Sequence, residues 1–199
     1  MNKKVQTINT YNATASAMAE KFNNIGARTD DIERGFSFVE KKDPFVFEIG
    51  CGNGRDAKEI LAHCHNYLGV DISEAMIRLA CEYAQEGKFE VVDIENYIFP
   101  MGLDLIFSFA SLLHSNKESV RGVLEKARRG LNEKGIFYIS LKYDDYRELT
   151  KTDEFGTRTY YLYNPEIIKE LAGDRYKTIF EDTHELRGQK WFTIVLQKI

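Results

Sequence analysis

One short stretch constrains this chain more than any other: an apolar run that ends in an acid and opens into alternating glycines. Residues 45–56 read Phe-Val-Phe-Glu-Ile-Gly-Cys-Gly-Asn-Gly-Arg-Asp. This order predicts a buried strand, a tight loop and the first turn of a helix. Glycine permits backbone conformations that other residues rarely adopt, and it lets a ligand approach where a Cβ would block it. The helix that follows directs its positive, amide-rich end at anything bound over the loop.

The spacing of the glycines separates two ligand classes. Dinucleotide sites use Gly-x-Gly-x-x-Gly, in which the third glycine allows close helix packing beside the pyrophosphate. Here Arg55 stands in that place, and the pattern is acid-x-Gly-x-Gly-x-Gly. This pattern resembles the class I S-adenosylmethionine (SAM)-dependent methyltransferases. The resemblance implies that Glu48, Gly50, Cys51 and Gly52 hold the amino-acid portion and the ribose of SAM.

Length and composition predict one enzyme-sized domain. With 199 residues, 43% of them hydrophobic and 13% aromatic, the chain can bury roughly 70% of its unfolded surface. No stretch approaches the roughly 20 apolar residues of a membrane span, and no signal peptide is expected at the N-terminus. Three cysteines without framework spacing favour a reducing compartment, so the cytoplasm is predicted. A net charge of −4 makes nucleic acid a poor first choice of partner. Nothing predicts the oligomeric state.

Residues 1–42 are predicted to form a helical cap on a domain that comprises residues 43–199. Apolar residues recur at helical spacing in two segments, Tyr11, Ala15, Met18 and Phe22 and then Ile32, Phe36 and Val39. Thr29 with the two acids after it is expected to cap the second helix. These helices either cover an edge of the sheet or close over the cofactor. The family resemblance implies the second role, with Tyr11 at the cofactor.

The second strand, residues 67–70, ends at Asp71. An acid at this position can accept hydrogen bonds from ribose hydroxyls, and Ser73 is expected to cap the next helix, which leaves Asp71 available. The resemblance implies that Ile72 and Met76 flank the adenine. Met76 also shares a helical stripe with Leu79, so core packing is an equally good interpretation.

Two further strands, residues 89–92 and 103–108, also end in polar groups. The resemblance implies that Asp93 and the backbone of Ile94 meet the adenine edge, although an ordinary turn aspartate is the alternative. Ser108 is assigned to the cofactor as well. In parallel α/β sheets ligands bind beyond the carboxyl ends of the strands, so the chemistry is expected there.

The loop after the fourth strand indicates the acceptor class and a candidate catalytic residue. It reads Ser-Phe-Ala-Ser, without the Asp/Asn-Pro-Pro-Tyr sequence common in methyltransferases that act on base amines, so a small-molecule acceptor is favoured. His114 is the candidate general base, with Ser111 beside the substrate. A packing or capping histidine is the alternative. Ser115 with Glu118 is predicted to form a capping box.

The segment from residue 142 to 163 is polar and aromatic and follows a fifth strand at 135–141. The resemblance implies that it lines the acceptor pocket, through Lys142, Tyr143, Arg158 and Tyr161. A solvated connector is the alternative. His63 and His65 flank Cys64, but no second cluster supplies further ligands at metal spacing, so no metal is expected.

The chain should end in a helix and a hairpin. Asn164 and Pro165 are typical of a helix start. Residues 176–180 and 191–196 are expected to pair across Arg187 and Gly188.

The predicted fold is α/β: a seven-stranded, mostly parallel Rossmann-like sheet with an antiparallel last strand, helices on both faces and the N-terminal helical cap. The predicted activity is methyl transfer from SAM to an oxygen, nitrogen or sulfur of a small acceptor, with S-adenosylhomocysteine as product. Two alternatives stay open, a SAM-binding regulatory module and a related group transfer from a modified donor. A nicotinamide oxidoreductase is disfavoured by Arg55.

Overall fold

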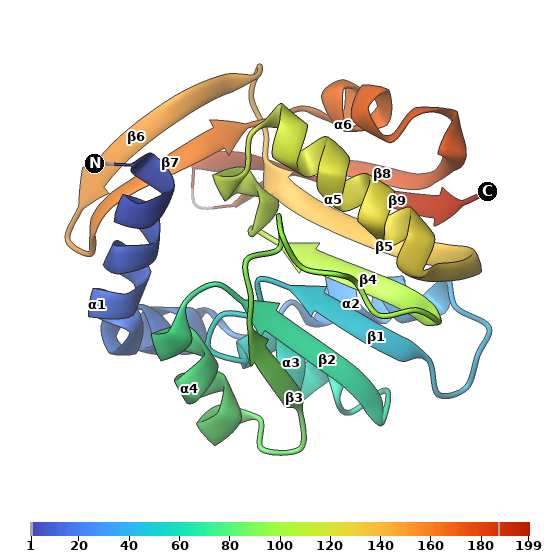
Figure 1. Ribbon diagram of the computed structural model, residues 1–199, viewed down its shortest axis with the longest axis horizontal. Coiled ribbons are helices and arrows are strands. Elements are labelled where there is room, and N and C mark those ends of the chain that lie inside the picture. Colours follow the sequence, from blue (N-terminus) through green and yellow to red (C-terminus); the bar gives the residue numbers. More distant parts are fainter. Residues whose placement is uncertain (1, 187) are drawn as a thin grey trace.

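The computed structural model describes residues 2–186 and 188–199. Figure 1 shows a central sheet with helices on both faces. The α-helices are α1 (Lys3–Ile25), α2 (Thr29–Ser37), α3 (Arg55–Ile60), α4 (Glu74–Tyr83), α5 (Lys117–Gly130) and α6 (Pro165–Ala172). The strands are β1 (Phe45–Ile49), β2 (Asn66–Asp71), β3 (Lys88–Val91), β4 (Leu103–Phe109), β5 (Leu131–Lys142), β6 (Arg147–Asp153), β7 (Gly156–Leu162), β8 (Tyr176–Leu186) and β9 (Gln189–Lys198). Two 3₁₀ turns, η1 (Leu112–His114) and η2 (Gly173–Arg175), complete the structure.

Seven strands form one sheet in the order β3-β2-β1-β4-β5-β9-β8. Strands β1 to β5 run parallel to one another, and β9 is antiparallel to both β5 and β8. The predicted fold class is therefore confirmed. The parallel strands all deliver their carboxyl ends to one edge, which is where a ligand of such a sheet binds.

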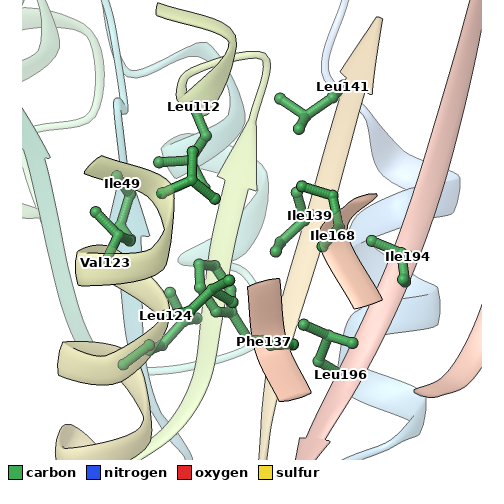
Figure 2. Close-up of a cluster of buried hydrophobic side chains, with 14 of the residues drawn as sticks. Ile49, Leu112, Val123, Leu124, Phe137, Ile139, Leu141, Ile168, Ile194 and Leu196 are labelled. Atoms are coloured by element: carbon green, nitrogen blue, oxygen red, sulfur yellow. The ribbon is translucent and has the colours of Figure 1, made fainter. Parts of the chain in front are cut away.

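The core lies in two layers because successive strand side chains point to opposite faces. Phe47 and Ile49 of β1 pack in the layer with α5 and α6, whereas Val46 packs with Ile32 of α2 and Ala57 of α3. Figure 2 shows the first layer, in which Val123 of α5 lies beside Ile49 of β1, and Ile168 of α6 lies beside Ile139 of β5 and Ile194 of β9. Helix α4 joins α1 in a third cluster around Met18 and Met76.

Two of the predicted helix starts are confirmed. The side chain of Asn164 accepts from the Ile167 N–H, with Pro165 at the first position of α6. The hydroxyl of Ser73 accepts from the Met76 N–H at the start of α4. Each side chain satisfies a backbone donor that has no partner within the helix.

Two other helix starts differ from the prediction. Asn116, rather than Ser115, caps α5, and its Oδ1 accepts from the Ser119 N–H at 2.9 Å. The Ser115 N–H instead closes η1 on the Leu112 carbonyl, which fixes Ser115 outside the helix. Helix α2 begins after Arg28 without a side-chain cap, so Thr29 does not have that role.

The segment from 142 to 163 contains a β-hairpin that the sequence did not predict. Strands β6 and β7 pair over seven residues and form their own two-stranded sheet. Helix α1 fastens the outer edge of β7: Thr7 Oγ1 accepts from the Thr159 N–H at 3.0 Å, and Thr10 Oγ1 donates to the Thr157 carbonyl at 2.8 Å. At the other hairpin, β8 and β9 pair as predicted, while Arg187 lies outside the described residues.

Substitution by alanine is expected to have opposite effects on stability at two helical glycines. A Cβ at Gly35 of α2 would lie 2.4 Å from the Phe107 ring, whereas a Cβ at Gly122 of α5 would meet nothing within 4 Å. We expect Gly35→Ala to lower the free energy of unfolding by about 1–3 kcal/mol through overpacking. Gly122→Ala should raise it by about 0.5–1 kcal/mol. Urea denaturation of both variants checks this, and equal effects would contradict the packing of α2 on β4.

Candidate active site

The glycine loop joins β1 to α3 with three residues in the left-handed region. Gly50, Gly52 and Gly54 have φ of +73°, +53° and +79°. A Cβ at Gly54 would lie 3.0 Å from the Ala80 Cα, so this glycine is needed for packing against α4. A Cβ at Gly52 would meet nothing within 4 Å. The backbone at Gly52 therefore faces open space in which a ligand can lie.

Asp71 stands at the end of β2 and braces this loop. Its Oδ2 accepts from the Gly52 N–H at 3.1 Å, and its Oδ1 accepts from the Ser73 N–H at 2.8 Å. Burial raises the pKa of Asp71. A carboxylate offers about four acceptor positions, so capacity remains for the hydroxyls of a ligand.

Glu48 and Cys51, both predicted at the cofactor, lie within the protein. Glu48 shares the face of β1 that packs against α2 and α3, is 1% exposed, and accepts from the Tyr67 hydroxyl at 2.5 Å. Burial, together with the negative charge of Asp56, raises the pKa of Glu48. The Cys51 side chain is buried, and its N–H donates to the Val70 carbonyl, as does that of Gly50. Both residues therefore support the conformation of the loop from its buried side.

Helix α1 crosses the carboxyl edge of the sheet, where Figure 1 shows it between β7 and α4. Four of its side chains form hydrogen bonds, each to a residue that follows one of the strands β1 to β4. The four pairs are Asn23 with Asn53 (2.8 Å), Asn12 with Ser73 (2.7 Å), Lys4 with Asp93 (2.8 Å) and Tyr11 with His114 (2.9 Å). Helix α1 therefore lies across the carboxyl edge of the sheet, whereas α2 packs with α3 on one face of the sheet.

The residues predicted at the adenine are partly engaged. Although burial opposes it, hydrogen bonding from Lys4 lowers the pKa of Asp93. The Ile94 carbonyl accepts from Lys126 Nζ at 3.1 Å. Met76 is 1% exposed and packs against Met18 of α1, in agreement with the core interpretation. Ile72 is half-buried between Asp71 and the start of α4.

His114 ends η1 and joins two distant segments. The Thr159 carbonyl can only accept, so Nδ1 carries the proton and donates to it at 2.6 Å. Nε2 is therefore unprotonated and accepts from the Tyr11 hydroxyl at 2.9 Å. Burial lowers the pKa of His114 to about 4, and the charges of Arg158 and Lys142 act in the same direction. Burial also raises the pKa of Tyr11. Both groups are neutral at physiological pH.

Two of the predicted acceptor residues join this cluster. Lys142 lies at the end of β5 with its Nζ 4.7 Å from the Tyr160 ring centroid. The Arg158 guanidinium lies 5.8 Å from the Tyr11 ring and 5.8 Å from that of Tyr160. The rings of His114 and Tyr160 are 5.0 Å apart. Residues from α1, η1, β5 and β7 thus meet in one place.

The other predicted residues lie around this cluster or away from it. Ser111 packs directly over Gly50, where a Cβ would come within 2.1 Å of its Oγ. Ser108 is fully buried on β4, and its Oγ has no hydrogen-bond partner among the described residues. Tyr143 and Tyr161 contact other aromatic side chains, Phe192 and Tyr146 respectively.

The sequence pattern favours Tyr161, but it is the Tyr160 ring that lies beside His114. Alternation along β7 puts Arg158 and Tyr160 on one face and Tyr161 on the other. The same period could have found Tyr160 once the segment was read as a strand. Asn12 carried no sequence signal, since its role arises from a contact with Ser73 on a distant element.

No group of three or more potential metal ligands occurs in residues 2–186 and 188–199. His63 instead stacks on Phe36 with ring centroids 4.8 Å apart. Within the same described ranges, no helix is both long and apolar enough to cross a bilayer.

The neutral state of the half-buried His114 predicts a dependence of stability on pH. Its folded pKa, about 4, lies below the ordinary value of 6.5, so the unfolded chain takes up the proton first. Stability is fully present above pH 6.5 and falls as the pH drops towards 4, by on the order of 2–3 kcal/mol. His114→Gln should remove this part of the acid destabilisation, whereas His65→Gln, at a side chain that is 95% exposed, should not. Urea unfolding across this pH range checks it, and identical pH curves would contradict the assignment.

This chain is similar to known proteins in two respects, the sequence of residues 46–135 and the overall fold. Residues 46–135 match the family model described as a methyltransferase domain. No curated protein matches the sequence.

Three solved structures illustrate the structural similarity. A protein from Pyrococcus horikoshii OT3 is 20% identical over 86% of this chain and 90% of its own, with a TM-score of 0.72. A TehB-like SAM-dependent methyltransferase from Corynebacterium glutamicum is 17% identical over 94% and 99%, with a TM-score of 0.71. The magnesium protoporphyrin IX methyltransferase of Synechocystis, solved with bound SAM, is 15% identical over 100% and 85%, with a TM-score of 0.66. The chain therefore has the fold of the class I SAM-dependent methyltransferases, and its residues 46–135 match the model of a methyltransferase domain.

Proposed function

We propose that this protein transfers the methyl group of SAM to an oxygen, nitrogen or sulfur of a small acceptor. The observation that carries the proposal is the open backbone at Gly52, braced by Asp71, within the methyltransferase domain. SAM supplies a methyl group on a sulfonium: the acceptor's electron pair forms the new bond, the S–CH₃ electrons return to sulfur, and S-adenosylhomocysteine leaves.

Features of the site fit this cofactor. Gly52 leaves room where a side chain would intrude, and Asp71 has acceptor capacity for ribose hydroxyls. Ser108 contributes a buried hydroxyl without a partner among the described residues, at the carboxyl end of β4. Asp93 can accept from an adenine amine while it keeps Lys4, because a carboxylate accepts several hydrogen bonds. The α1 contacts support a lid role for residues 1–42.

The protein's own contribution to the reaction is mainly positional. Holding two reactants in line can supply about 7–11 kcal/mol of the barrier. The neutral Nε2 of His114 can take the acceptor's proton, either directly or through the Tyr11 hydroxyl that is bonded to it. We place the protein in the cytoplasm, because Cys51, Cys64 and Cys81 are all free thiols.

Calorimetric titration with SAM and S-adenosylhomocysteine tests the cofactor. Asp71→Asn should weaken binding by about ten- to a hundredfold, because it removes a charged acceptor. Asp174→Asn, at an exposed aspartate of η2, should leave the affinity unchanged. If the wild-type protein binds neither compound, the methyltransferase proposal fails. Binding without turnover across an acceptor screen would favour a regulatory module.

With an acceptor from that screen, the Tyr11–His114 pair can be tested. His114→Gln should lower kcat by about 10²–10⁴-fold through loss of the base, with little change in SAM affinity. Tyr11→Phe keeps the ring and tests the relay separately. In the wild type, kcat should stay level down to about pH 5 and fall as the pH approaches the His114 pKa of about 4. A parallel collapse of SAM affinity would reassign His114 to the binding shell.

A further inference from the structure

The strongest unexplained feature of the cluster is the charge of Lys142. Its ammonium lies 4.7 Å from the Tyr160 ring and 5.8 Å from the Trp191 ring. Among the described residues it makes no hydrogen bond and no ion pair. Burial lowers the pKa of Lys142, and the positive charges of Lys151 and Arg158 lower it further. A half-buried cation that is held beside other cations destabilises the site unless an anion joins it.

Arg158 adds a second incomplete cation. It is 8% exposed, and its guanidinium pairs with Asp153 through Nη2. Its Nε–H is buried and has no acceptor among the described residues. Buried N–H groups nearly always have partners, so an unpaired one at a candidate site indicates a missing acceptor.

The geometry brings these groups together on one side of the hairpin. Lys151 lies directly opposite Arg158 in the β6–β7 register. The negative charge of Asp153 raises the pKa of Lys142, whereas the positive charges of Lys151 and Arg158 lower it. With His114 neutral, three positive charges therefore stand against one negative charge. This surplus lies beside Tyr160, whose ring contacts that of His114.

We propose that Lys142 and Arg158 bind the anionic group, a carboxylate or a phosphate, of the small acceptor, next to the faces of Tyr160 and Trp191. This inference rests on the proposed function, because it names the acceptor class of that same site. Both anions accept charge-assisted hydrogen bonds from an ammonium and a guanidinium. The flat aromatic faces suit a planar or apolar body behind the anion.

Trp191 provides a direct readout. It is the only tryptophan of the chain and pairs opposite Lys142 in the sheet. Tryptophan fluorescence is followed during titration with benzoate, phenyl phosphate and the neutral analogue benzamide, with and without S-adenosylhomocysteine. We expect a saturable change with at least one anion, and binding of benzamide at least tenfold weaker. A response to benzoate alone, to phenyl phosphate alone or to both identifies the anion and supports the proposal.

Matched variants separate the site from general charge effects. Lys142→Gln should weaken anion binding by about tenfold, and Lys142→Arg should retain most of it. Lys177→Gln removes one charge from an exposed position on β8 and should change nothing. Arg158→Lys, which keeps the charge but loses Nε, gives a second, independent weakening if any Lys142 variant fails to fold.

Three results would overturn the inference: no saturable response of the wild type to either anion, equal affinities in wild type and Lys142→Gln, or benzamide bound as tightly as benzoate. Calorimetric titration of the same samples with S-adenosylhomocysteine tells the two proposals apart. Cofactor binding without anion binding rejects only the acceptor class. Anion binding without cofactor binding rejects the methyltransferase proposal and leaves the anion site standing.

Discussion

Two hydrogen bonds to one neutral imidazole hold the candidate site together. His114 follows β4, its Nδ1–H donates to Thr159 of β7, and its Nε2 accepts from Tyr11 of α1. The partners lie 45 and 103 residues away in sequence, so this side chain links both the hairpin and the N-terminal helix to the end of β4, in addition to the bonds that Thr7 and Thr10 make to β7. Protonation would remove the acceptor at Nε2, because an imidazolium nitrogen can only donate, so the Tyr11 hydroxyl would have to turn and accept instead. The low pKa of His114 is therefore consistent with its structural position.

The acids and the cations of the site differ in how fully they are paired with other groups of the protein. Asp71 and Asp93 have partners within the protein, through backbone N–H groups and through Lys4. Lys142 and the Nε of Arg158 do not, among the described residues. Buried donors and half-buried charges without a partner are uncommon in natural proteins, and a bound ligand is one source of the missing acceptor. The contrast agrees with our proposals, in which the cofactor would lie near Gly52 and the acceptor near Tyr160.

Helix α1 connects these halves to each other. Its side chains reach residues after each of the first four strands, and its threonines fasten β7. If α1 closes over the ligands, as we propose, it would have to open for them to enter. Opening would cost several hydrogen bonds, each worth about 0.5–1.5 kcal/mol net, which is within reach of the binding energy of a cofactor.

By itself, the sequence determined the sheet, the glycine loop and the acid after β2, because hydrophobic period, glycine spacing and strand ends are local properties. It also indicated His114, Lys142 and Arg158, as polar residues near strand ends or in the aromatic insertion. Only the tertiary structure decided that Tyr160 rather than Tyr161 faces the cluster, that Met76 packs against α1, and that Asn116 rather than Ser115 caps α5. These outcomes depend on strand alternation in an unpredicted hairpin and on contacts between elements far apart in sequence. The state of Glu48 and of His114 was likewise decided by burial, a property of the assembled fold that no local pattern contains.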